Sequence, residues 1–159
     1  MYEIERKFIL KKMPSNISAP IAQQRYYIVN KNGFEMRTQR VGSKYYFERK
    51  VSSNELSSAK VKFEISETEF NELKRNCREP IERDNFKVSG YLGASIKIYK
   101  GKHNGLKRAE FEFESENDAT AFEKPDWVGE EITSSPIGRD GKLAKLSEIE
   151  FKKELQKYL

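Results

Sequence analysis

The first residues of the chain alternate charged and apolar side chains with the two-residue period of a β-strand. After Tyr2 the sequence continues with Glu-Ile-Glu-Arg-Lys-Phe over residues 3–8. Successive side chains of a strand point to opposite faces, so Glu3, Glu5 and Lys7 share one face. Two carboxylates and an ammonium are costly to bury unless charged partners compensate them. A divalent cation with a phosphate chain would compensate all three, because carboxylates bind the cation and the ammonium binds phosphate.

Alternation of the same kind recurs along the chain and predicts eight strands. Turn signals that contain glycine, such as those at 31–33 and 102–105, separate the strands. We expect one antiparallel sheet with strands over Tyr2–Leu10, Gln24–Asn30, Phe34–Arg40, Lys44–Val51, Lys60–Ser66, Glu79–Val88, Ala94–Lys100 and Lys107–Glu114.

Three helices are predicted from their N-terminal signals. Ser66 and Ser147 are each followed three residues later by a glutamate, which is the pattern of a capping box. Ser115 is expected to cap a third helix, which lies between the other two in the sequence and also has an acidic first turn. The helix after Ser66 is expected over 66–77, and the helix after Ser147 closes the chain.

The polar faces of the predicted strands carry charges of both signs. One strand places Glu35 and Arg37 on the same face, and the next does so with Glu48 and Lys50. A solvated outer face explains this pattern, as in antiparallel sheets that face water on one side. A closed barrel with a polar lumen explains it as well, because about eight strands make a barrel wide enough for a small ligand.

Length and charge narrow the classes of function. At 159 residues we expect a single domain over residues 1–159, and the net charge of +5 favours anionic partners. Nucleic acid is not favoured, because the charge excess is small and the aromatic residues occupy core positions. The single cysteine, Cys77, suits a reducing compartment, and no apolar run has membrane-spanning length. We therefore expect a cytoplasmic protein without a membrane partner, and a homodimer is left open.

Three segments, taken together and in order, carry a resemblance to a known family. They are Glu3-x-Glu5-x-Lys7, the stretch Gly105-Leu106 followed by Ala-Glu-Phe-Glu-Phe at 109–113, and Pro-Asp-Trp-Val-Gly-Glu-Glu-Ile-Thr at 125–133. The chain resembles the CYTH family, also called triphosphate tunnel metalloenzymes. This family includes class IV adenylate cyclases, thiamine triphosphatases and inorganic triphosphatases.

The resemblance implies a fold and a set of site residues. The fold is α+β and mainly antiparallel β, with an eight-stranded closed tunnel barrel, a polar lumen and a few flanking helices. Acidic residues of the tunnel would hold Mg²⁺ or Mn²⁺, and these are Glu3, Glu5, Glu110 and Glu112. Basic residues would bind the phosphates, and these are Lys7, Arg37, Lys50 and Arg83, joined by Lys60, Lys62 and Lys97.

The chain departs from the family pattern at several of these positions. A glutamate pair of the fifth strand falls on Lys60 and Lys62, and an aspartate of the seventh strand falls on Lys97. Each exchange of an acid for a lysine changes the local charge by about two units, which is a large effect in a low-dielectric lumen. We expect one metal site to be weakened or lost, which leaves one, and attraction for a polyanion to rise. A solvated face remains the other explanation of the three lysines.

The sequence supports a metal-dependent hydrolase of a triphosphate-containing substrate. A non-catalytic binder of polyphosphate or nucleotide is the alternative, motivated by the three lysines, and adenylate cyclase activity is a weaker one. Among other residues, we expect Trp127 in the core, Glu131 near the acidic cluster and His103 in a solvated loop.

Overall fold

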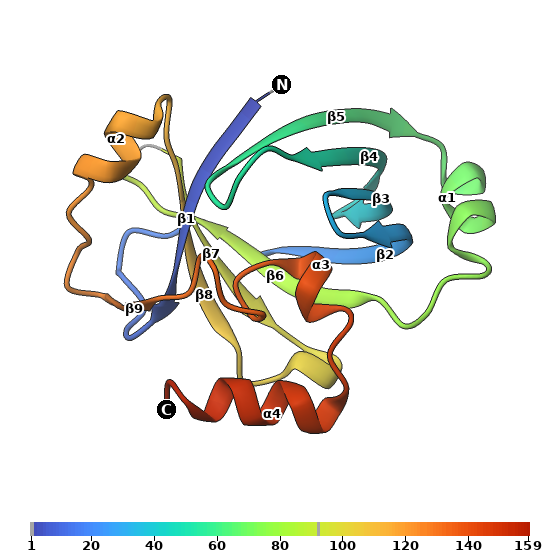
Figure 1. Cartoon of the computed structure of the whole chain (residues 1–159). Helices are drawn as coiled ribbons and strands as arrows, with labels where there is room; N and C mark the ends of the chain where they lie inside the picture. The colour runs from blue at the N-terminus through green and yellow to red at the C-terminus, as the bar shows by residue number, and fades with distance from the viewer. Residues whose placement is uncertain (1, 92) are drawn as a thin grey trace.

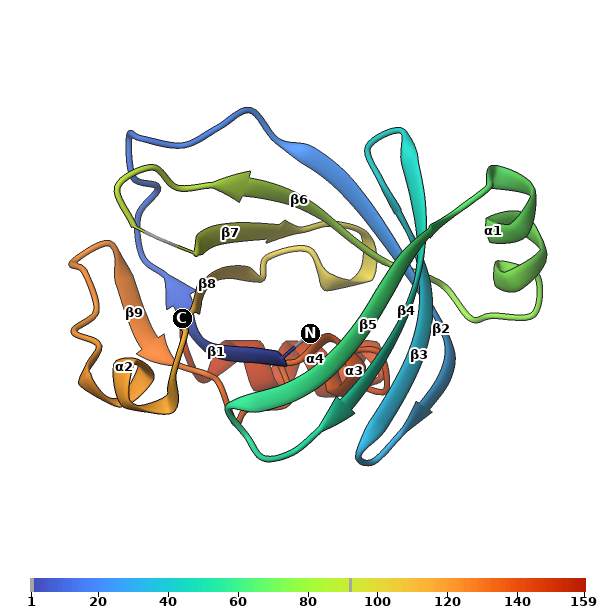
Figure 2. The same cartoon turned by 90° about the horizontal axis from the view of Figure 1, so that it is seen from above.

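The computed structural model describes residues 2–91 and 93–159, and its main feature is a closed antiparallel barrel (Figures 1 and 2). Eight strands follow one another in the order β5-β4-β3-β2-β6-β7-β8-β1, and β1 pairs with β5 to close the ring. A ninth strand, β9, adds to β1 outside the ring. The predicted eight-stranded barrel is therefore confirmed, with one short strand that the sequence pattern did not reveal. The strands are β1 Tyr2–Leu10, β2 Ile21–Lys31, β3 Phe34–Val41, β4 Lys44–Ser52, β5 Ser57–Ile65, β6 Ile81–Lys87, β7 Ala94–Tyr99, β8 Lys107–Glu112 and β9 Val128–Glu131.

The barrel closes where β1 meets the start of β5. Glu3 lies opposite Ser58, Ile4 lies opposite Ser57, and the Glu5 N–H donates to the Leu56 carbonyl at 3.0 Å. Both serines are buried at this seam. Strand β5 thus begins three residues before the prediction, because pairing with β1 extends it through serines of low β-propensity.

The predicted helix starts agree with the structure. Ser66 and Ser147 each accept a hydrogen bond from the third helical residue at 3.1 Å in a complete capping box, and Ser115 caps its helix at 3.0 Å. A fourth short helix begins after Arg139, whose side chain makes no capping bond, so it carries no sequence signal. The helices are α1 Glu67–Lys74, α2 Glu116–Ala121, α3 Asp140–Leu143 and α4 Glu148–Gln156, with a 3₁₀ turn, η1, at Gly101–His103.

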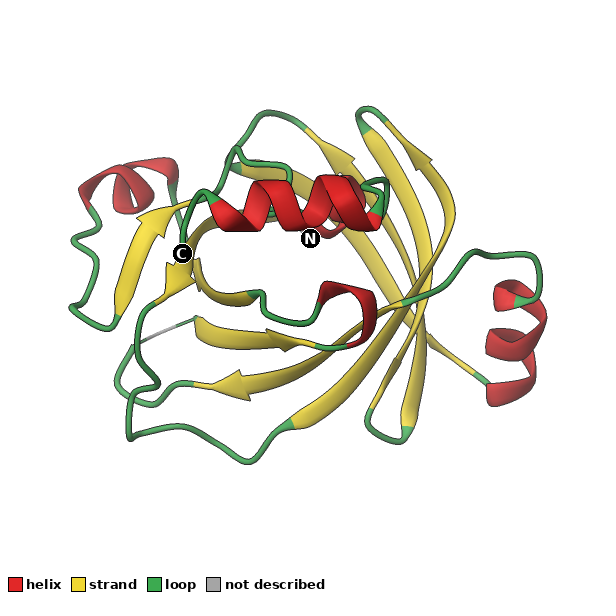
Figure 3. Ribbon diagram, turned by 90° about the horizontal axis from the view of Figure 1, so that it is seen from below, coloured by secondary structure: helices red, strands yellow, loops and turns green. Residues whose placement is uncertain are grey.

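The barrel has two hydrophobic cores, one outside its wall and one that closes an end of its polar interior. One core packs Phe8 and Phe111 against Phe122 after α2, with the Trp127 ring 5.6 Å from that of Phe111 as the prediction of a core tryptophan required. A second core lies around Phe151 of α4, on the side of the barrel shown in Figure 3. No helix of the described residues is long and apolar enough to cross a membrane.

Two expectations about single residues were wrong. Glu131 lies on the outer face of β9 and binds the Arg6 guanidinium at 2.6 Å, because Arg6 points away from the lumen. His103 is only 1% exposed, and its ring packs edge-on against Phe151 with centroids 5.2 Å apart. Its two ring nitrogens make no hydrogen bond within the described part of the chain. The C-terminal helix α4 covers this loop, which local sequence could not show.

Burial of His103 predicts a pH-dependent stability. Burial, with a smaller contribution from Lys102, lowers the pKa of His103 from 6.5 to about 4. As the pH falls from 6.5 towards 4, His103 is protonated in the unfolded chain but stays neutral in the folded chain, so the free energy of unfolding decreases. In urea unfolding, the free energy of the wild type should fall by about 2–3 kcal/mol more than that of H103L between pH 7 and 4.5. Equal losses in the two proteins would contradict this assignment.

Candidate functional site

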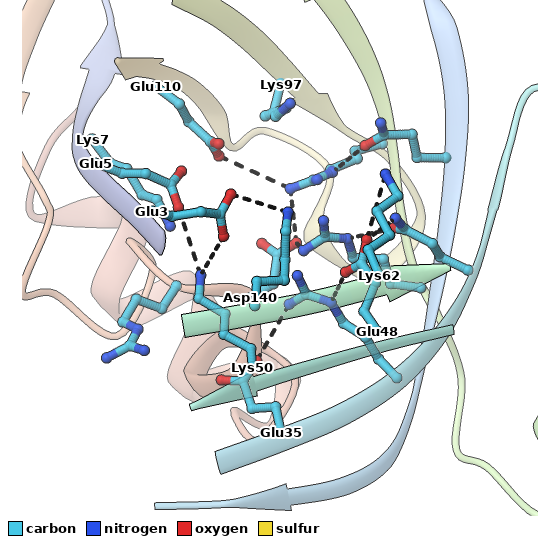
Figure 4. A pocket seen from close by; sticks show the side chains of 18 of the residues that line it. Glu3, Glu5, Lys7, Glu35, Glu48, Lys50, Lys62, Lys97, Glu110 and Asp140 are labelled. Atoms are coloured by element: carbon cyan, nitrogen blue, oxygen red, sulfur yellow. Dashed lines mark hydrogen bonds and ion pairs between the residues drawn. The ribbon is translucent and has the colours of Figure 1, made fainter. Parts of the chain in front are cut away.

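The barrel encloses a charged cavity of about 160 Å³ (Figure 4). Strands from every side of the ring contribute to its wall, and among the described residues ten basic and seven acidic side chains line it. All of the predicted site residues reach this cavity, so the polar faces of the strands point inward. Those residues are Glu3, Glu5, Lys7, Arg37, Lys50, Lys60, Lys62, Arg83, Lys97, Glu110 and Glu112.

Two lysines neutralise the glutamates of β1. The Lys60 ammonium lies 3.0 Å from a carboxylate oxygen of Glu3. The Lys50 ammonium lies 3.6 Å from Glu5 and 3.9 Å from Glu3. These lysines come from β5 and β4, which follow β1 around the ring. The fifth strand, where the family pattern has acids, thus supplies an ammonium to the acids of the first strand.

Glu112 of β8 completes an acidic cluster with these glutamates. It lies directly opposite Glu5 in the register of β1 and β8. Burial and the charges of Glu5 and Glu3 raise the pKa of Glu112. Burial also opposes ionisation of Glu5, but Lys7 and Lys50 outweigh it and lower the pKa of Glu5 to about 2. Glu112 is therefore the carboxylate of this cluster that an additional positive charge would stabilise most.

The predicted set of four metal ligands divides into two groups. Glu110 does not join the cluster, because the Arg108 guanidinium binds one of its oxygens with two hydrogen bonds of 2.6 and 2.9 Å. Within residues 2–91 and 93–159, no three acidic, histidine or cysteine side chains are arranged to hold a metal ion. The oxygen donors of Glu3, Glu5 and Glu112 suit a hard divalent cation in their chemistry. Lys50 and Lys60 must release these oxygens before a cation can use them.

Glu48 of β4 is a buried acid that the site prediction missed. It is 1% exposed, and its carboxylate accepts a hydrogen bond of 2.6 Å from Arg37 and another from Gln39. Lys62 of β5 lies opposite Glu48 in the strand register, with its ammonium 3.6 Å from the carboxylate. An acid on β4 therefore offsets part of the positive charge that Lys62 brings, and its position two residues before Lys50 was a usable sequence signal.

Asp140 is a second buried acid outside the predicted set. It is the first residue of α3, and it accepts hydrogen bonds from Arg25, Arg83 and Arg108 at 3.1, 2.8 and 3.0 Å. The Tyr99 hydroxyl donates to the same carboxylate at 2.6 Å. Because α3 is not a strand, no alternation pattern could place Asp140 in the lumen.

Lys7 and Lys97 are buried ammonium groups without an ion pair among the described residues. They are 8% and 7% exposed, and the Lys97 ammonium has the side-chain amide oxygen of Asn85 as its hydrogen-bond partner. Burial lowers the pKa of Lys7 to about 8 and that of Lys97 to about 7, although Glu110 acts in the opposite direction on both. Buried cations that make no ion pair and face a cavity indicate a site for an anion.

Curated relatives match nearly the whole chain. An inorganic triphosphatase of Acetivibrio thermocellus is 30% identical over 155 residues, which cover 94% of this chain and 97% of that protein. An inorganic triphosphatase of Nitrosomonas europaea is 30% identical over 149 residues, with coverage of 91% and 97%. No family model matches the chain.

The chain belongs to the CYTH family of triphosphate tunnel enzymes. The crystal structure of the inorganic triphosphatase NE1496 aligns with a TM-score of 0.66 at 26% identity, over 91% of this chain and 95% of that one. A putative adenylyl cyclase from Hippeastrum, with a TM-score of 0.52 and 11% identity over 74% of this chain and 82% of that chain, shares the fold alone. The family resemblance of the sequence is confirmed, and the family implies dependence on a divalent metal in general.

The pKa of Lys97 predicts that anion binding takes up a proton. Near pH 8 this ammonium is largely deprotonated in the free protein, and a bound polyanion favours its charged form. Calorimetry of tripolyphosphate in buffers of different ionisation enthalpy should show more proton uptake for the wild type than for K97R, whose guanidinium stays charged. The affinity of the wild type relative to K97R should fall as the pH rises from 6 to 8. Identical proton uptake in both proteins would refute this role of Lys97.

Proposed function

We propose that this protein hydrolyses inorganic triphosphate within the barrel. The observation that carries the proposal is the closed lumen with ten basic side chains, two of which are buried ammonium groups without an ion pair among the described residues. Its relatives of nearly equal length are named inorganic triphosphatases. A lumen with this charge attracts a small polyanion and holds it away from bulk water.

The size and lining of the cavity favour an inorganic substrate. A volume of 160 Å³ corresponds to about five waters at ~30 Å³ each, which is room for a short phosphate chain. No aromatic side chain is among the described residues that line it, so nothing there offers a stacking surface for a base. Adenylate cyclase activity, which requires an adenine site, is not favoured.

One divalent cation, Mg²⁺ or Mn²⁺, is proposed to accompany the substrate. Glu3, Glu5 and Glu112 would hold it, whereas Glu110 stays with Arg108. When bound, such a cation neutralises phosphate oxygens and makes a coordinated water more acidic. The lysines at 50 and 60 then become available to the phosphate chain.

The side chains of the lumen are proposed to stabilise the charge that moves during the reaction. Water adds to the terminal phosphorus, the bond to the bridging oxygen breaks, and pyrophosphate leaves with that electron pair. Four basic side chains would neutralise the oxygens on which charge develops: Lys7 of β1, Lys97 of β7, Arg37 of β3 and Arg83 of β6. Neighbouring acids and amides hold the side chains of Lys97, Arg37 and Arg83, so these three need little reorganisation.

The direct test is phosphate release from tripolyphosphate with Mg²⁺ or Mn²⁺. We expect E5A to lose about 10²-fold or more of the activity, by analogy with the removal of one charge-stabilising group. E64A is the matched control, because Glu64 lies near the end of β5, is not among the described residues that line the cavity, and is 57% exposed and paired with Lys44. No release by the wild type, or equal rates for E5A and E64A, would exclude the proposal.

The alternative function is binding of a polyphosphate or nucleotide without hydrolysis, and the names of the relatives do not favour it. The lysines at 60, 62 and 97 nevertheless predict that binding survives without metal. Calorimetry with tripolyphosphate in EDTA should show a dissociation constant within about tenfold of the value with metal, while hydrolysis stops. Loss of binding together with hydrolysis would show that the lysines do not replace a cation.

A further inference from the structure

Asp140 connects four neighbouring strands through a single carboxylate. One oxygen accepts from Arg108 of β8 and from the Tyr99 hydroxyl of β7. The other oxygen accepts from Arg25 of β2 and from Arg83 of β6. Strands β2, β6, β7 and β8 are consecutive in the barrel, so this aspartate spans about half of the ring from the inside (Figure 4).

The backbone around Asp140 is fixed on the opposite wall of the barrel. The Asn30 side chain of β2 donates to the Gly141 carbonyl at 2.7 Å, and the Arg139 guanidinium binds the hydroxyl of Ser52 at the end of β4. A Cβ at Gly141 would meet the Glu35 carboxylate of β3, so the backbone at this position lies closely against that side chain. The chain on each side of Asp140 is therefore held against β2, β3 and β4.

Each of the three arginines is also held at its other end. The Nε atoms of Arg25 and Arg83 donate to Gln39 and Gln23 at 2.9 and 2.7 Å, and Arg108 Nε donates to Glu110. A guanidinium has five N–H donors in one plane, so these contacts set its orientation. Arg25 and Arg83 keep several donors for a ligand, whereas Arg108 also donates a second time to Glu110 and to the Ile137 carbonyl and keeps fewer.

An acid inside an anion-binding cavity has an unfavourable effect that must be outweighed. By charge alone, Asp140 repels a phosphate chain. Burial also opposes its ionisation, yet Arg83, Arg108 and Arg25 hold the pKa of Asp140 well below its ordinary value. Three guanidiniums that repel one another stay together only with such a counter-charge between them.

We propose that Asp140 is a positioning residue that aligns Arg25, Arg83 and Arg108 as one clamp for the phosphate chain. This inference rests on the proposed binding of a polyphosphate in the lumen. It assigns to the C-terminal segment, which supplies no predicted site residue, the task of organising the basic side chains of three strands.

The test uses the sign of a change in affinity. D140N removes one negative charge, but its amide keeps only one acceptor oxygen for the four donors. E64Q is the matched control for the loss of one negative charge, because Glu64 is not among the described residues that line the cavity and pairs with Lys44 at 3.5 Å. Calorimetry with tripolyphosphate in EDTA should show about tenfold or more weaker binding by D140N, and unchanged binding by E64Q. Unchanged or tighter binding by D140N would overturn the proposal.

D140E covers the case in which D140N does not fold. It keeps the charge and moves the carboxylate by one methylene, so a loss of affinity can arise only from geometry. We expect D140E to raise the KM for tripolyphosphate about fivefold or more, with a smaller change in kcat and with a wild-type circular dichroism spectrum. Wild-type KM in folded D140E would show that Asp140 is only a counter-charge.

Failure of the function itself gives a different result. If the wild type does not bind tripolyphosphate, the proposed ligand is wrong, and none of the variants will bind it either. If the wild type and E64Q bind and D140N binds equally well per folded molecule, the ligand stands and the positioning role is excluded.

Discussion

Pairing between buried charges of opposite sign is the interaction on which this structure depends. An isolated ion in the interior costs several kcal/mol, and only partners with good geometry offset that cost. Six of the seven acids that line the lumen have a basic partner within 4 Å, and Glu48, paired with Arg37, is the most buried of these acids. Glu112 is the exception among the described acids, and burial and the charges of Glu5 and Glu3 raise its pKa. Lys7 and Lys97 are the corresponding exceptions among the described lysines of the lumen.

A charged lumen moves one hydrophobic core to the outside of the barrel. The apolar residues of β1, β7 and β8 face outward, so α2, β9 and the segment between them must cover them. Helix α4 instead packs with Ile81 and Tyr99 in the second core, which closes one end of the barrel. On the wall formed by β4 and β5 the cover is incomplete, with Val61 54% and Phe63 52% exposed. The C-terminal third of the chain therefore has two tasks, because it covers apolar surface outside and delivers Asp140 inside. This arrangement explains why His103, in a loop rich in polar residues, is buried beneath α4.

The exchanges of acids for lysines leave a smaller excess of positive charge in the lumen than the sequence suggested. Lys60 binds Glu3 and Lys62 lies against Glu48, so two of the three lysines have a partner on an adjacent strand. Lys97 has no acidic partner among the described residues, and its ammonium donates to the side chain of Asn85 on β6. The excess of basic over acidic side chains remains, ten against seven, and it is concentrated where arginines share acids. A short phosphate chain supplies the missing negative charge without a hydrophobic contact, which agrees with the all-polar lining.

The sequence by itself determined which side chains point into the barrel. The period of a strand is fixed by the peptide backbone, so Glu3, Glu5 and Lys7 had to share a face, and the outward position of Ile4 and Phe8 followed. The same rule placed Lys60, Lys62 and Lys97 in the lumen. Arg25 and Arg108 lay on these faces too and could have been found by the same alternation. What only the tertiary structure decided is which charges meet, because Glu48 with Lys62 and Asp140 with Arg83 lie on segments that strand pairing and the course of α3 bring together. Local periodicity orients a side chain, but the partner of a buried charge depends on closure of the ring.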